Sequence, residues 1–89
     1  MSAVWKFLLT PGQPLVTPGY ARILHVGEQR GRLMAWVLVH DPAAPPVERY
    51  LLIVGTGHIL PSEERPYIGT AILADGDLVL HVFDEEVPF

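Results

Sequence analysis

The sequence predicts an all-β domain, built as a small antiparallel sandwich or a partly open barrel of six to seven strands. Nine prolines and eight glycines interrupt the 89-residue chain so often that no segment with a 3.6-residue period is long enough for a helix. The segments between these breaks are rich in Val, Ile, Leu, Trp, Tyr and Phe, which favour strands. Short strands at regular spacing, separated by turn residues, are typical of sandwiches and barrels.

The strands are expected, in chain order, at residues 4–9, 14–17, 22–26, 32–40, 48–54, 67–73 and 78–83. Thr10-Pro11-Gly12 ends the first strand, and Pro18-Gly19 is a turn pair after the second. The polar segment 27–31 joins the next two strands as an antiparallel pair.

Three further breaks separate the later strands. Residues 41–46 hold prolines, which lack the N–H that a ladder needs. A proline-bounded loop follows residue 60, and a single helical turn is compatible with residues 60–64. Asp75-Gly76 lies between two apolar runs, which predicts a hairpin there.

Several of these strands are apolar on both faces. Residues 50–54 and 78–83 do not alternate between apolar and polar, as strands with one wet face do. A chain of this size has little interior in which to bury two faces, and without cysteines it has no disulfide to stabilise it. We therefore expect the second face to be covered, and we favour a homo-oligomer.

Composition narrows the class of protein. We expect a single domain over residues 1–89, and a hydrophobic fraction of 49% with a mean hydropathy of +0.29 excludes intrinsic disorder. The apolar runs are far shorter than the ~20 residues that cross a bilayer. With no signal peptide at the start, this predicts a cytoplasmic protein and no membrane partner. A net charge of −4 argues against direct nucleic-acid binding.

The candidate ligand-binding residues comprise a glycine turn, a set of arginines and a tyrosine. They are Gly55, Thr56, Gly57, His58, Arg22, Arg30, Arg32, Arg49 and Tyr67. Glycines one apart allow positive φ, so the turn at 55–58 can direct N–H groups at an anion, and guanidinium groups grip phosphate or carboxylate. The alternatives are a tight turn that binds nothing, and arginines that reflect codon usage.

Metal binding and catalysis find little support in the sequence. A zinc or copper site would have to be built from His25, His58 and His81, but their spacing matches no metal motif, so no metal and no cofactor are expected. The chain has no cysteine and no serine in a nucleophile elbow, so we predict a protein that is not an enzyme. The two tryptophans are expected in the core or at a subunit contact.

An ordered set of short segments resembles a known family. The segments are 4–7, 21–27 with Gln29 and Gly31, Trp36 with 38–39 and 41–42, 55–58 with Pro61, 67–70, and 78–79 with 81–83. The set, which covers nearly the whole chain, resembles a family of short uncharacterised proteins encoded by phages, prophages and bacterial genomes. Leu80 stands where many members of that family have a second tryptophan.

The resemblance implies an origin but no activity. A viral or prophage protein acts in the host cytoplasm, and small phage proteins often disarm a host system. By analogy, we expect a non-enzymatic homo-oligomer that sequesters a small anionic or nucleotide-like ligand. The alternative is an inhibitor or adaptor that docks on a host protein through its acidic or apolar surface.

Overall fold

The structure of the chain is a computed structural model, and it describes residues 1–60 and 65–84. Its strands are β1 (Ala3–Leu8), β2 (Leu15–Pro18), β3 (Arg22–Gln29), β4 (Arg32–Val39), β5 (Pro46–Arg49), β6 (Leu51–Gly55), β7 (Tyr67–Leu73) and β8 (Leu78–Asp84), with a 3-10 turn, η1 (Ala74–Gly76), between the last two. The predicted all-β class is confirmed, with eight strands in place of six to seven. The helical turn considered for residues 60–64 lies, apart from Leu60, outside the described residues.

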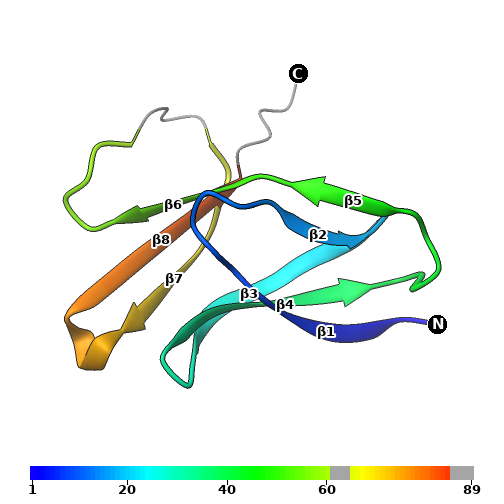
Figure 1. The fold of residues 1–89 in the computed structure, drawn as a ribbon, viewed down its shortest axis with the longest axis horizontal. Coiled ribbons are helices and arrows are strands. Elements are labelled where there is room, and N and C mark those ends of the chain that lie inside the picture. The colour runs from blue at the N-terminus through cyan, green and yellow to red at the C-terminus, as the bar shows by residue number, and fades with distance from the viewer. Residues whose placement is uncertain (61–64, 85–89) are drawn as a thin grey trace.

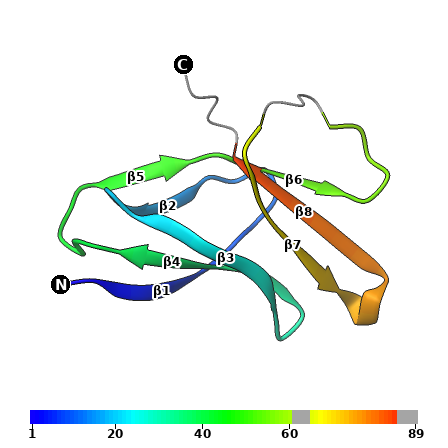
Figure 2. The ribbon, with the colours of Figure 1, turned by 180° about the vertical axis from the view of Figure 1, so that it is seen from behind.

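The strands form three small antiparallel sheets (Figure 1). Sheet A has the order β1-β4-β3, sheet B pairs β2 with β5, and sheet C has the order β6-β8-β7. Figures 1 and 2 show sheet B opposite β4 and β1, with sheet C beside both. The sheets make a compact, sandwich-like fold that is not closed into a barrel. No helix within the described residues is long and apolar enough to cross a membrane.

The core lies between the sheets and is built mainly from small aliphatic side chains. Along β4, alternate residues are buried, and the residues between them are half-buried or exposed. The buried apolar residues are Leu9, Leu15, Val26, Leu33, Ala35, Val37, Val39, Ala71, Leu73 and Val82. On the other face of sheet A, Val4 and Leu8 are 54% and 50% exposed. The chain therefore leaves apolar sheet surface uncovered, as its strands suggested.

The segment predicted as one strand over residues 48–54 is two strands in two sheets. Arg49 pairs with Leu15 in sheet B, whereas Leu51 pairs with Asp84 in sheet C. The chain changes sheet at Tyr50, whose hydroxyl donates a hydrogen bond to Glu48 Oε2 at 2.9 Å. That hydrogen bond, together with the negative charge of Glu48, raises the pKa of Tyr50. The apolar residues Leu51 to Val54 all belong to β6, where every one of them is half-buried, so neither face of this strand is fully exposed.

Both predicted hairpin turns are present. β3 and β4 are joined by Arg30 and Gly31, which take φ values of 53° and 77°. Such a turn of two left-handed residues matches the twist of the strands it joins. The Asp75-Gly76 connection between β7 and β8 adopts the η1 turn, with Leu73 opposite Leu78.

The tryptophans are not core residues, so that part of the expectation is wrong. Trp5 lies on the edge strand β1 and is 38% exposed. Trp36 occupies a half-buried position on β4, between the buried residues Ala35 and Val37. Since neighbouring residues of a strand point to opposite faces, Trp36 lies on the outer face of sheet A. On β4 itself, the buried face carries only Leu33, Ala35, Val37 and Val39.

Candidate functional site

A cavity of about 520 Å³ lies where β3, β5 and β7 meet. Its lining consists of Ala21, Arg22, Ile23, Val47, Arg49, Tyr67 and Ile68, and we call it the junction cavity. It is open to solvent and combines two guanidinium groups, a phenol ring and aliphatic side chains. Three of the residues nominated from the sequence, Arg22, Arg49 and Tyr67, are thus brought together from strands far apart in the chain.

An ion pair holds one wall of the junction cavity. The Nη2 atom of Arg49, at the end of β5, donates to Asp84 Oδ2, at the end of β8, at 2.7 Å. The two side chains are only 22% and 15% exposed, so the pair is well shielded from water. It ties sheet B to sheet C, and the carboxylate balances most of the charge of Arg49.

Arg22 carries the charge that is available to a ligand in the junction cavity. Its side chain is exposed, and no described residue forms a hydrogen bond or an ion pair with it. An exposed guanidinium can turn its donors toward an entering anion at little cost.

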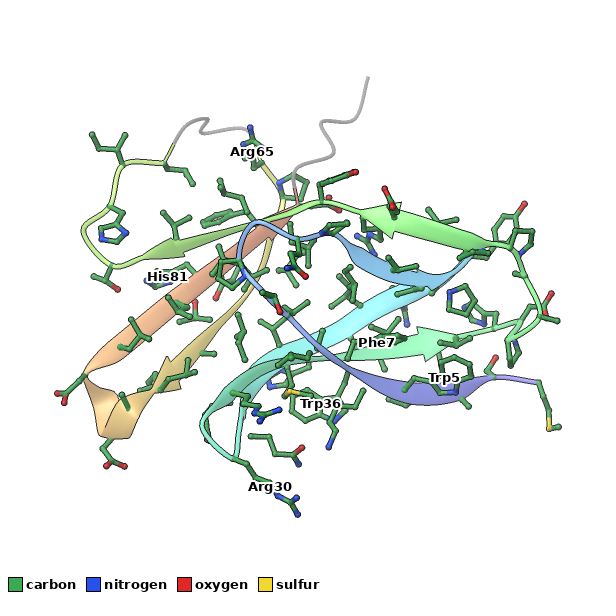
Figure 3. The ribbon with its side chains drawn as sticks, in the orientation of Figure 1. Trp5, Phe7, Arg30, Trp36, Arg65 and His81 are labelled. Atoms are coloured by element: carbon green, nitrogen blue, oxygen red, sulfur yellow. The ribbon has the colours of Figure 1, made fainter. Side chains whose placement is uncertain are left out.

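A chain of hydrogen bonds runs from Tyr67 to a second cavity. The Tyr67 hydroxyl lies 2.6 Å from Thr70 Oγ1, which lies 3.0 Å from His81 Nδ1. The Nε2 atom of His81 is 2.7 Å from Thr56 Oγ1. Both ring nitrogens of His81 therefore face hydroxyl groups, which fixes the plane of the imidazole (labelled in Figure 3).

The glycine turn lines that second cavity, of about 190 Å³. Its lining consists of Val54, Gly55, Thr56, Gly57, His58, Leu60, His81 and Phe83, and we call it the turn cavity. Only Gly57 of the two glycines has positive φ, at +89°. A Cβ atom on Gly55 would lie 3.1 Å from the ring of His58, so this glycine makes room for the imidazole.

Two backbone N–H groups of the glycine turn already donate hydrogen bonds within the protein. The N–H of Thr56 donates to the Val79 carbonyl at 3.2 Å, and the N–H of His58 donates to the Gly55 carbonyl at 3.1 Å. These two groups are not free to bind an anion. The side chains of Thr56 and His58, rather than an array of N–H groups, are what the turn presents.

The nine nominated residues therefore separate into three places. Arg22, Arg49 and Tyr67 line the junction cavity, and Gly55 to His58 line the turn cavity. Arg30 lies at the tip of the β3–β4 hairpin and Arg32 at the start of β4, and neither lines these cavities. Figure 3 shows Arg30 pointing away from the body of the protein.

The structure separates the histidines that would have to form a metal site. His25 lies beside Trp36 on sheet A, with ring centroids 5.8 Å apart, whereas His58 and His81 line the turn cavity. Within residues 1–60 and 65–84, no group of three His, Cys, Asp or Glu side chains is placed to hold a metal ion.

A hydroxyl and a base lie together at Thr56 and His81, as in nucleophilic enzymes. In such enzymes the second ring nitrogen faces a carboxylate, which stabilises the imidazolium that forms during the reaction. Here it faces the hydroxyl of Thr70. The arrangement orients His81 but gives it no negative partner, so it suits binding better than proton abstraction.

Sequence reasoning missed Asp84, Thr70 and Phe83. Asp84 pairs with Arg49, Thr70 links Tyr67 to His81, and Phe83 packs edge-on against Tyr67 at 5.6 Å between ring centroids. Thr70 and Phe83 act through cross-strand neighbours on β8 and β7, whereas Asp84 reaches Arg49 on β5, in another sheet. Only the pairing of these strands, which the sequence did not reveal, places them at the site.

Comparison with known proteins identifies a family but no annotated relative. A family model described as a domain of unknown function, DUF7352, matches residues 1–88. No curated protein and no solved structure matches the chain. The function must therefore be argued from the residues themselves.

Proposed function

This chain belongs to the DUF7352 family, and we propose that it is a non-enzymatic binding protein that sequesters a small anionic, nucleotide-like ligand. The observation that carries the proposal is the junction cavity. There Arg22, which has no partner among the described residues, the half-buried ion pair Arg49–Asp84, and the exposed ring of Tyr67 surround one space of about 520 Å³. Ligand pockets of this size combine apolar walls with a few placed polar groups.

The ligand is held by three kinds of contact. Arg22 donates to a phosphate, and a charge-assisted hydrogen bond of this kind contributes about 1.5–3 kcal/mol. The ring of Tyr67, 60% exposed, stacks on a base, and Ile23 and Val47 contact its edge. Arg49 is held in place by Asp84 and offers its remaining N–H groups. Nothing is turned over, and neither a metal nor a cofactor takes part.

A homo-oligomer would close this cavity. In one subunit it is open, and Val47 and Tyr67 at its rim are 45% and 60% exposed. A bound small molecule normally has most of its surface buried. A second copy placed over the rim would supply that burial and would cover apolar side chains that are otherwise exposed to water.

The biological setting follows from the resemblance to phage and prophage proteins. Such a protein would act in the cytoplasm, the host cytoplasm if viral, and would counter a host system by removing a nucleotide signal. Tight burial of the ligand without turnover is sufficient for that role.

The proposal is tested by thermal unfolding in the presence of nucleoside monophosphates and cyclic nucleotides. A ligand present at about ten times its Kd stabilises the fold by about 1.4 kcal/mol and raises Tm by roughly 6–10 °C. Arg22→Gln should weaken binding of the active compound at least about 10-fold. Arg30→Gln, at the exposed hairpin tip, is the matched control and should bind like the wild type.

If no compound shifts Tm, or if both arginine variants behave alike, the junction cavity is not the binding site. The alternative is then an inhibitor or adaptor that docks on a host protein. Sheet B favours docking on a host protein. There the exposed Val16 lies opposite the exposed Glu48, so one surface carries both an apolar and an acidic side chain. A host protein that copurifies with the wild type but not with Val16→Lys would support it.

A further inference from the structure

The outer face of sheet A has a chemistry unlike the rest of this acidic chain. We define this outer face by Lys6, His25, Gly27, Arg32, Met34 and Trp36, and the exposed Val4 and Leu8 lie on the same side along β1. Cross-strand register places them together, since Trp36 pairs with both Lys6 and His25, and Met34 pairs with Gly27. Figure 3 shows Trp36 on the side of sheet A turned away from sheet B. Nothing in the junction cavity belongs to this set.

Gly27 allows the indole of Trp36 to lie against the sheet. A Cβ atom at Gly27 would lie 3.6 Å from Cζ3 of Trp36 and 3.0 Å from Nε2 of His25. The two rings therefore converge over this glycine, with centroids 5.8 Å apart and planes inclined by 40°. The indole thus packs close to the backbone at this glycine, and Trp36 as a whole is half-buried. The pair forms an aromatic platform on a sheet, fixed by packing rather than by a flexible loop.

The charges around this platform are positive. Lys6 lies directly across from Trp36 and donates a hydrogen bond to Gln29, while the exposed Arg32 lies two residues from Met34 on the same face. Glu28 is the single carboxylate in β1, β3 and β4, and it pairs with the buried Leu33, which puts it on the opposite face. The three strands of sheet A thus carry no carboxylate on this face, although the net charge of the chain is −4.

We propose that the outer face of sheet A binds single-stranded nucleic acid. Bases stack on Trp36 and His25, and phosphates contact Lys6 and Arg32, the combination that strand-binding sheets use. The net charge led us to expect no nucleic-acid binding, but net charge averages over faces that differ in sign. A short strand contacts only the face that receives it, and none of the described residues of β1, β3 and β4 puts a carboxylate on this face.

The occupant is a single strand and not a duplex or a peptide. A flat sheet has no protruding helix or ribbon to enter a groove, so it reads bases only where they are unpaired. An apolar peptide would not account for Lys6 and Arg32 beside the rings, or for the lack of a carboxylate. This inference is independent of the proposed function, because it uses other residues.

The test is fluorescence anisotropy with labelled DNA and RNA oligonucleotides of ~12 nucleotides, a length that one small sheet can contact. The wild type should bind at low salt, and its affinity should fall as the salt concentration rises from about 50 to 200 mM. In a plot of log K against log salt concentration, the slope should be about −0.7 for each phosphate contacted. Trp36→Ala should weaken binding by about 5-fold or more. Trp36→Phe, which keeps an aromatic ring, should retain most of the wild-type affinity.

Trp5→Ala is the matched control, since Trp5 is a tryptophan of the same sheet but of the other face. It should bind like the wild type. Lys6→Gln and Arg32→Gln should each reduce the salt slope by nearly one phosphate contact. Unfolding curves of every variant separate lost binding from lost structure.

Two results overturn the proposal. One is the absence of binding by the folded wild type at low salt, which would leave this face to a protein partner. The other is an equal effect of Trp5→Ala and Trp36→Ala. A mononucleotide that raises Tm equally in the wild type and in Trp36→Ala would report on the junction cavity alone. That result would support the proposed function but not nucleic-acid binding by the outer face.

Discussion

At the scale of single residues, the Arg49–Asp84 pair combines a structural and a binding role. It joins the end of β5 to the end of β8 at 2.7 Å, in a place that is mostly shielded from solvent. Breaking such a pair costs more than its formation contributes, because a half-buried carboxylate loses its strongest neighbour. The same guanidinium lines the junction cavity, so stability and binding are linked at one side chain.

Arg49→Met should therefore lower the free energy of unfolding by about 1–3 kcal/mol, measured by urea denaturation. Arg49→Lys keeps the positive charge but loses the planar guanidinium group. Its free energy of unfolding should therefore lie between those of Arg49→Met and the wild type. Arg30→Met, at an exposed turn, is the control and should change stability by no more than about 0.5 kcal/mol. Wild-type stability in Arg49→Met would mean that the ion pair does not hold the sheets together.

At the scale of elements, the contact between β3 and β7 joins sheet A to sheet C without hydrogen-bonded pairing. Gly69 on β7 faces Val26 on β3 so closely that a Cβ atom would lie 2.5 Å from Val26 Cγ2. Val26 is 1% exposed and cannot move aside into solvent. The missing side chain thus sets the distance between the two sheets, and with it the position of Tyr67 at the start of β7.

Gly69→Ala should separate these strands and lower the free energy of unfolding by about 1–3 kcal/mol, as overpacking does. Val26→Ala alone should also destabilise, because it leaves a cavity. The double variant should be more stable than the sum of the two effects predicts, since the new methyl group fills the space that the valine vacates. Strictly additive losses in a double-mutant cycle would show that the two residues do not press on one another.

At the scale of the whole molecule, the sequence predicts most of the strands but not their arrangement. Local signals suffice for the hairpins at Arg30-Gly31 and Asp75-Gly76, because turn residues act on their own neighbours. They do not suffice at Tyr50, where the chain leaves sheet B for sheet C inside a segment predicted as one strand. No glycine or proline lies between Arg49 and Leu51 to mark the change.

For the candidate site too, the sequence predicts some of the residues but not how they are arranged. Residue type alone nominated Arg22, Arg49 and Tyr67, which do share a cavity, and also Arg30 and Arg32, which lie elsewhere. Arginines on different strands look alike in a sequence. β3, β5 and β7 belong to three different sheets, and only the packing of these sheets, which turn residues do not encode, brings their side chains together.

Oligomerisation is the remaining prediction at this scale, and it follows from exposed apolar surface. We expect light scattering to give a homo-oligomer whose Tm rises with protein concentration. Val47 and Ile72 are 45% and 61% exposed, but only Val47 borders the junction cavity. Val47→Lys should therefore produce a monomer that no longer binds the ligand, because a charge at a buried contact is costly.

Ile72→Lys is the matched control, since it adds the same charge to a side chain on β7 that lies outside the junction cavity. It should leave the oligomer intact. A specific interface buries about 1,200–2,000 Å² in total, so one lysine at its centre weakens it far more than one at a distance. A wild type that stays monomeric and folded at every concentration, or two lysine variants that assemble equally, would show that the cavity is complete within one chain.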